Sequence, residues 1–268
     1  MEEGSMSETT RQNLGVLVRS VFLYAVFLAY FYDFLPWYVL VLSNVIFYPA
    51  VYLLIHDLGH GAASKKIWFT SYYPFTADPI WGGLRTFRDT HYRHHRYFGT
   101  YEDPWLPYYN GAPQLALFWN FFESEYSGYR YFKSKGFDKN LALSILLNTL
   151  TILINVLFFG PAYFVQVLSQ RIVRSLAIFL FNYYTHRSGF SKNASYGVYD
   201  REHDLRYFLP LFRFMWGRVL VNGLIYHNRH HSIKNWNVPV KFYHNLTDEK
   251  VYTTYQQEWP IKEIQHLN

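Results

Sequence analysis

The sequence predicts an all-α integral membrane protein, with about four transmembrane helices in two hairpins and a polar helical cap on the cytoplasmic side. Strongly apolar runs, most of them close to the ~20 residues that a bilayer span needs, alternate with polar blocks rich in Lys and Arg. Aromatic residues make up 22% of the chain, and Tyr and Trp favour membrane–water interfaces. The mean hydropathy of -0.11 is low for a bundle of spans alone, which indicates a substantial polar cap.

The first hairpin is predicted near the N-terminus. Residues 1–12 are polar and acidic, unlike a signal peptide, and we expect them to form a short disordered arm. Leu14 to Leu35 is almost continuously apolar, Asp33 to Pro36 is a tight reversal, and Trp37 to Ile55 resumes the apolar run. We expect the second helix of this hairpin to carry the histidines that follow it out of the membrane.

The second hairpin is predicted within residues 141–184, with less certain bounds. A reversal at Gly160-Pro161 is natural, but it leaves Arg171 and Arg174 inside the fourth span. A reversal at 166–174 instead leaves that span only about ten residues long, which is short for a bilayer. We therefore expect the two arginines either to reach the membrane surface or to face a polar cavity.

The polar blocks 61–140 and 186–268 hold most of the Lys and Arg residues, whereas the Asp33–Pro36 turn holds none. The positive-inside rule places both blocks in the cytoplasm. An amphipathic stretch at Tyr207–Ile225 is suited to the membrane surface. The net charge of +6 is then explained by topology, without a nucleic-acid partner. We expect residues 1–268 to form a single domain, because no linker or low-complexity tract divides them.

Eight of the 12 histidines lie in three clusters, which are HDLGH at 56–60, HYRHH at 91–95 and HNRHH at 227–231. On a helix, positions i, i+3 and i+4 share one face, so each cluster directs its imidazoles the same way. One such pair is ordinary in a surface or a core. Three clusters together indicate a metal site.

The ligand types narrow the kind of metal centre. The chain has no cysteine, which excludes thiolate zinc sites, iron–sulfur clusters and Cys-ligated haem. One zinc ion takes about four ligands, and eight clustered histidines exceed that number. Imidazole suits iron, copper, nickel and zinc alike. The residues therefore predict a nitrogen-rich site for two metal ions without naming the element.

The three clusters and the predicted hairpins resemble the membrane fatty acid desaturase superfamily, over roughly residues 35–240. This resemblance implies two non-haem iron ions (Fe2+/Fe3+) that activate dioxygen, held in a cytoplasmic cap. Carried over residue by residue, the iron ligands would be His56, His60, His91, His94, His95, His227, His230 and His231.

Further site residues are implied by the same resemblance. Stearoyl-CoA-type members have an Asn and a His four residues apart after the last span, and Asn182 and His186 have that spacing here. His186 would be a ninth ligand. Asn182 would act on the metal site through water, from outside the ligand set. The N–H groups of the ligand imidazoles also need acceptors that fix their orientation, and the candidates for these are Asp57, Asp103, Asp200 and Glu202. For Asp103, a plain turn with an Asp-Pro cap is an equally good interpretation.

The function implied by the resemblance is oxygen-dependent desaturation of an acyl chain, in a membrane lipid or an acyl thioester. No His-Pro-Gly-Gly haem motif occurs in the sequence, so we expect a separate electron donor of the ferredoxin or cytochrome b5 type. A hydroxylase or carotenoid-type ketolase on the same scaffold is the alternative, because residues 185–187 and 200–203 resemble ketolases. A zinc-binding membrane hydrolase or a metal carrier is a more distant alternative.

Overall fold

The computed structural model describes residues 8–52, 83–98, 100–183, 186, 207–216 and 221. This described part contains eight α-helices and no strand, which confirms the all-α prediction. The α-helices are α1 Glu8–Phe31, α2 Trp37–Tyr52, α5 Gly83–Tyr97, α6 Pro113–Phe121, α7 Glu123–Lys135, α8 Lys139–Phe159, α9 Pro161–Ile178 and α12 Leu209–Trp216.

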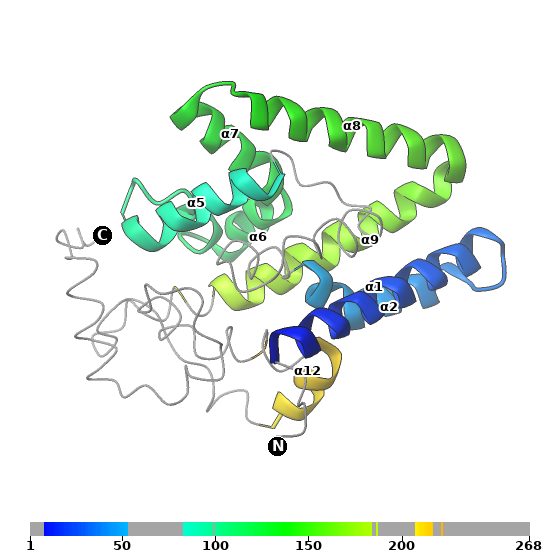
Figure 1. Cartoon of the computed structure of the whole chain (residues 1–268). Helices are drawn as coiled ribbons and strands as arrows, with labels where there is room; N and C mark the ends of the chain where they lie inside the picture. Colours follow the sequence, from blue (N-terminus) through cyan, green and yellow to red (C-terminus); the bar gives the residue numbers. More distant parts are fainter. Residues whose placement is uncertain are drawn as a thin grey trace, which may run out of the picture.

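Helices α1 and α2 lie side by side (Figure 1). The turn between them falls at the predicted reversal, where Asp33 adopts a φ of 60°, a conformation that Asp tolerates better than most residues. Phe27 and Leu40 are buried between the helices and pack near Phe159 of α8. Helix α1 begins at Glu8, so residues 8–12 are helical rather than part of the expected arm.

Helices α8 and α9 meet at Gly160, whose φ of 52° favours glycine. Asp138 caps the start of α8 by accepting hydrogen bonds from the backbone N–H groups of Leu141 and Asn140, at 2.8 and 3.1 Å. The bond to Leu141 is the largest cause that lowers the pKa of Asp138 to about 2. Of the two reversals considered from the sequence, the structure has the one at Gly160.

Two described helical stretches, Leu14–Phe31 and Lys139–Phe159, are long and apolar enough to cross a membrane. Only 11% of the second stretch is buried inside the protein, so most of its apolar side chains point outward. The Trp37–Tyr52 helix is apolar but shorter. Four spans in two transmembrane hairpins, with the cap in the cytoplasm, remain a prediction.

Polar side chains join α2 to α9 in the interior. Asn44 is fully buried, and its Nδ2 donates to Gln166 Oε1 at 2.9 Å and to Ser169 Oγ at 2.8 Å. Helices that pack within a membrane must satisfy such groups with one another. This pairing explains why the fourth apolar run contains amides and hydroxyls that weaken its hydropathy.

The two arginines of α9 lie against α6 and α7. Arg174 is fully buried; its Nη2 donates to the backbone oxygen of Phe121 at 3.2 Å. Arg171 pairs with Glu125 at 2.7 Å. Arg174 therefore faces a backbone oxygen in the interior, whereas Arg171 pairs with a partly exposed carboxylate.

Helix α12 is fastened to α1 by one arginine. Arg19 Nε donates to the backbone oxygen of Met215 at 2.8 Å, and Arg19 Nη2 to that of Phe214 at 2.9 Å. These carbonyls are at the end of α12, where helical partners run out and a cation is favoured. The helix therefore packs beside the first part of α1 (Figure 1).

A charged residue in the middle of α8 tests whether this helix faces lipid. Leu150 is 44% exposed. We expect Leu150→Lys to reduce the fraction of protein that resists carbonate extraction from membranes, because Lys at the centre of a span costs about 2.5–3.5 kcal/mol. Gln114→Lys, at an exposed position of α6, is the control. Equal extraction of both variants would contradict a lipid-facing α8.

Candidate metal centre

Helix α5 directs the second histidine cluster into the interior. His91, His94 and His95 are each at most 1% exposed, because positions i, i+3 and i+4 lie on one helix face. Elsewhere on the helix, Arg88 is exposed, and its Nε donates to the hydroxyl of Tyr92 at 3.0 Å. The buried face of this helix therefore carries imidazoles, where an ordinary amphipathic helix carries apolar side chains.

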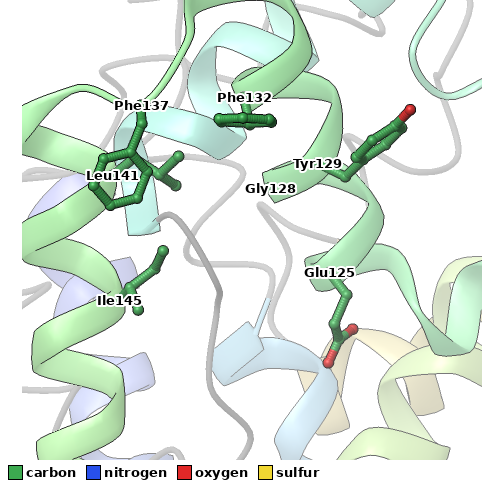
Figure 2. A pocket seen from close by; sticks show the side chains of 7 residues that line it. All are labelled: Glu125, Gly128, Tyr129, Phe132, Phe137, Leu141 and Ile145. Atoms are coloured by element: carbon green, nitrogen blue, oxygen red, sulfur yellow. The ribbon is translucent and has the colours of Figure 1, made fainter.

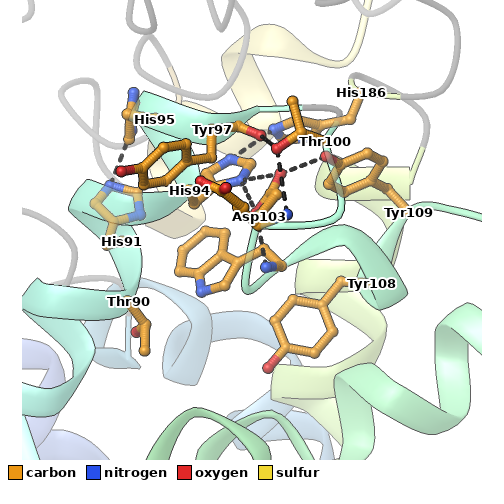
Figure 3. Close-up of polar contacts among 12 residues, drawn as sticks. Thr90, His91, His94, His95, Tyr97, Thr100, Asp103, Tyr108, Tyr109 and His186 are labelled. Atoms are coloured by element: carbon orange, nitrogen blue, oxygen red, sulfur yellow. Dashed lines mark hydrogen bonds and ion pairs between the residues drawn. The ribbon is translucent and has the colours of Figure 1, made fainter. Parts of the chain in front are cut away.

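The imidazoles meet in two pairs (Figure 3). The Nε2 atoms of His91 and His95 are 3.2 Å apart, and those of His94 and His186 are also 3.2 Å apart. Two nitrogens that each lie about 2.0–2.1 Å from one metal ion are separated by about 2.9–3.4 Å at octahedral or tetrahedral angles. Both pairs have a spacing that suits a shared metal ion.

The tautomers of one pair follow from its other contacts. His94 Nδ1 lies 3.0 Å from both carboxylate oxygens of Asp103, and His186 Nδ1 lies 2.8 Å from the backbone oxygen of Asn182. These oxygens only accept, so each Nδ1 donates, and each Nε2 of a neutral ring carries a lone pair. Two lone pairs cannot hydrogen-bond to each other, but both can bind one cation. The residues therefore fit a metal ion.

Asp103 organises the loop behind His94. Its side chain is fully buried. Besides His94, it accepts hydrogen bonds from the backbone N–H of Trp105 at 2.7 Å and from the hydroxyl of Tyr109 at 2.5 Å. This carboxylate therefore closes a turn and also contacts a predicted ligand, and its role in orienting a metal ligand stays a prediction. A carboxylate in this position fixes the orientation of an imidazole that binds a metal.

Two aromatic rings cover the pair of histidines. Trp105 stacks on His94, with ring centroids 4.6 Å apart and an angle of 19°. Tyr109 stacks on His186 at 4.9 Å and 21°. Sequence analysis missed the roles of both, since no motif marks them. The sequence feature that could have indicated these roles is that Trp105 and Tyr109 follow Asp103 by two and six residues.

A π-helical segment, Phe179–Tyr183, ends α9 and leads to His186. Segments of this type are rare and are often found at functional sites. The backbone oxygen of Asn182 lies 2.8 Å from Nδ1 of His186. The predicted role of the Asn182 side chain stays a prediction.

The structure brings together four predicted ligands and one predicted orienting carboxylate, which are His91, His94, His95, His186 and Asp103. Apart from Asn182, the other predicted site residues lie outside the described part of the chain; they are His56, His60, His227, His230, His231, Asp57, Asp200 and Glu202. Within the described part, no group of three or more His, Asp or Glu side chains could hold a metal ion. The full ligand set stays a prediction.

A separate hollow of about 310 Å³ lies between α7 and α8 (Figure 2). Its lining is mostly apolar and contains none of the histidines. The lining residues are Glu125, Gly128, Tyr129, Phe132, Phe137, Leu141 and Ile145.

Comparison with families of known proteins gives one match. The model of a family described as fatty acid desaturase matches residues 34–235, which is well over half of the chain. The match includes all the predicted site histidines. Comparisons with curated proteins and with solved structures give no match.

Asp103 offers a test of the site that leaves the histidines in place. We expect Asp103→Asn to weaken metal affinity by about 10–100-fold, because loss of an orienting carboxylate typically has that effect. Competition with a chelator measures the affinity. Glu102→Gln changes a neighbouring exposed carboxylate and serves as the control. Equal affinities for both variants would show that Asp103 does not support a ligand.

Proposed function

The chain belongs to the fatty acid desaturase family, and on that premise we propose that it desaturates an acyl chain with dioxygen and external electrons. The family implies a membrane di-iron oxygenase type of function. The acyl chain would belong to a membrane lipid or to an acyl thioester. The electrons would come from a separate ferredoxin or cytochrome b5 type donor.

The observation that carries this proposal is the pair of Nε2 lone pairs on His94 and His186. Imidazole nitrogen is a suitable ligand for iron. His91 and His95 would contribute through their own close pair, and the five predicted histidines outside the described part would complete the set. Two bound irons would supply the activation of dioxygen with the external electrons.

The surrounding residues set the tautomers of the histidines and pack against their rings. Asp103 keeps the proton on His94 Nδ1, and the backbone of Asn182 does the same for His186. Phe87 stacks on His91 with ring centroids 5.4 Å apart. The buried rings exclude water, which limits side reactions at the site.

Metal analysis of detergent-purified protein tests the proposal first. We expect about two irons per chain, as for a di-metal site with the predicted ligands, and a sharp fall in His94→Ala and His186→Ala because each loses a nitrogen ligand. His266→Ala, outside the predicted clusters, is the control. Zinc at full occupancy after iron-replete expression would favour a hydrolase or a metal carrier instead.

The product formed in an expressing host distinguishes the remaining candidates. We expect lipid profiles to show new double bonds with the parent protein, and none with His94→Ala. An inserted hydroxyl or keto group in place of a double bond would identify a hydroxylase or a ketolase. Sequence similarity of residues 185–187 and 200–203 to ketolases keeps that second candidate in the test.

A further inference from the structure

Four oxidisable rings lead from the histidine pair to the protein surface. Trp105 stacks on His94 at 4.6 Å, and Trp105 and Tyr108 are 6.0 Å apart. Tyr108 and Tyr126 are 5.9 Å apart, and Tyr126 and Tyr129 are 6.3 Å apart, all measured between ring centroids. Each ring therefore nearly touches the next. We call these four residues the aromatic chain.

The two ends of the aromatic chain differ in exposure. Trp105 is 7% exposed and Tyr108 is fully buried, whereas Tyr129 is 54% exposed. Tyr129 also lines the hollow between α7 and α8 (Figure 2). A small molecule can therefore reach the outer end of the chain, while the inner end touches a candidate metal ligand.

The phenolic hydroxyl of Tyr108 lies close to a buried carboxylate. It donates to the backbone oxygen of Glu123 at 3.3 Å and lies 3.5 Å from Ser127 Oγ, which donates to Glu123 Oε1 at 3.2 Å. A turn of the hydroxyl toward Ser127 gives its proton a path to the carboxylate. Burial raises the pKa of Glu123, although the charge of Arg174 opposes this effect. A tyrosine that loses an electron also loses its proton, so a linked carboxylate that readily takes a proton makes that oxidation easier.

Burying the Glu123 carboxylate costs desolvation free energy. A buried carboxylate and a buried guanidinium both lose hydration, and their attraction often only repays that loss. Tyr52 donates to Glu123 Oε2 at 2.8 Å, which satisfies the second oxygen. Glu123 offsets the charge of the buried Arg174, and its Oε1 also lies within reach of the Ser127 hydroxyl beside Tyr108.

We propose that the aromatic chain is a one-electron path that protects the site histidines when a strong oxidant forms there without substrate. The proposal takes that oxidant from the oxygen chemistry of the proposed function. Low-potential electrons from a donor protein do not travel this way, because Tyr and Trp relay charge only after a stronger oxidant has oxidised them. The chain is therefore distinct from the route of the reducing electrons.

The electrons and protons balance as follows. The oxidant takes one electron from Trp105, and Trp105 recovers it from Tyr108, whose proton passes through Ser127 to the Glu123 carboxylate. Tyr126 then reduces Tyr108, which regains its proton from Glu123, while Tyr126, which is partly exposed, releases its own proton to solvent. Tyr129 reduces Tyr126, which takes a proton back from solvent. Tyr129 releases its proton to solvent and is restored by a hydrogen atom from a small thiol, which becomes a thiyl radical. One electron has moved from the thiol to the oxidant, and one proton has entered the solvent.

Photo-oxidation of the iron-free protein tests this path directly. The natural sequence has no cysteine, so Tyr101→Cys provides a unique attachment point for a ruthenium photo-oxidant. Tyr101 is 72% exposed and precedes the loop that carries Trp105. Flash oxidation with a spin trap present, followed by peptide mass spectrometry, locates the radical. We expect trap adducts on Tyr129.

Variants of the middle ring decide the route. Tyr126→Phe keeps the shape but resists oxidation, so the Tyr129 adduct should be lost, and Tyr126→Trp should restore it. Tyr131→Phe makes the same change on the same helix outside the aromatic chain and should leave the adduct intact. A parent protein with no Tyr129 adduct, or a Tyr126→Phe variant with an undiminished one, would overturn the proposal. No iron is present, so neither result depends on desaturase activity.

Discussion

The contact between Asp103 and His94 is the interaction on which the rest of the site depends. The carboxylate fixes the proton on Nδ1 of the imidazole, and this turns Nε2 toward His186. The same carboxylate accepts hydrogen bonds from the Trp105 backbone and the Tyr109 hydroxyl. Those two residues stack on the two histidines. One buried acid thus sets a tautomer, the path of a loop and the packing of two rings, so these features form one unit.

This unit rests on a bundle that is held by polar contacts as well as by apolar ones. Asn44 joins α2 to α9 through Gln166 and Ser169, and Arg174 joins α9 to the end of α6. Apolar packing between helices in a membrane tolerates sliding, because lipid is as apolar as the helix surface. Hydrogen bonds fix one register. The amides and hydroxyls that make these bonds leave α9 less apolar than α2 and α8.

Local patterns predicted the features that depend on neighbours in the chain. The 91–95 spacing predicted one buried helix face, and Gly160 marked the reversal between α8 and α9. Contacts between distant segments were beyond such patterns. Nothing near Arg174 in the sequence indicates that it meets α6, and nothing near Tyr109 indicates that it joins Asp103 to a histidine. Resemblance to a family supplied His186, which periodicity alone does not connect with a cluster 92 residues earlier.

The fastening of α12 by Arg19 has a consequence for how the protein is made. The two partners are 195 and 196 residues apart. At ribosomal rates the arginine therefore emerges roughly 10–40 s before the carbonyls that it binds. During that interval its charge lies within the first apolar helix without these acceptors. The segments that bear the described histidines are synthesised before α12. The contact between α1 and α12 is therefore formed late, although α1 is the first helix to be made.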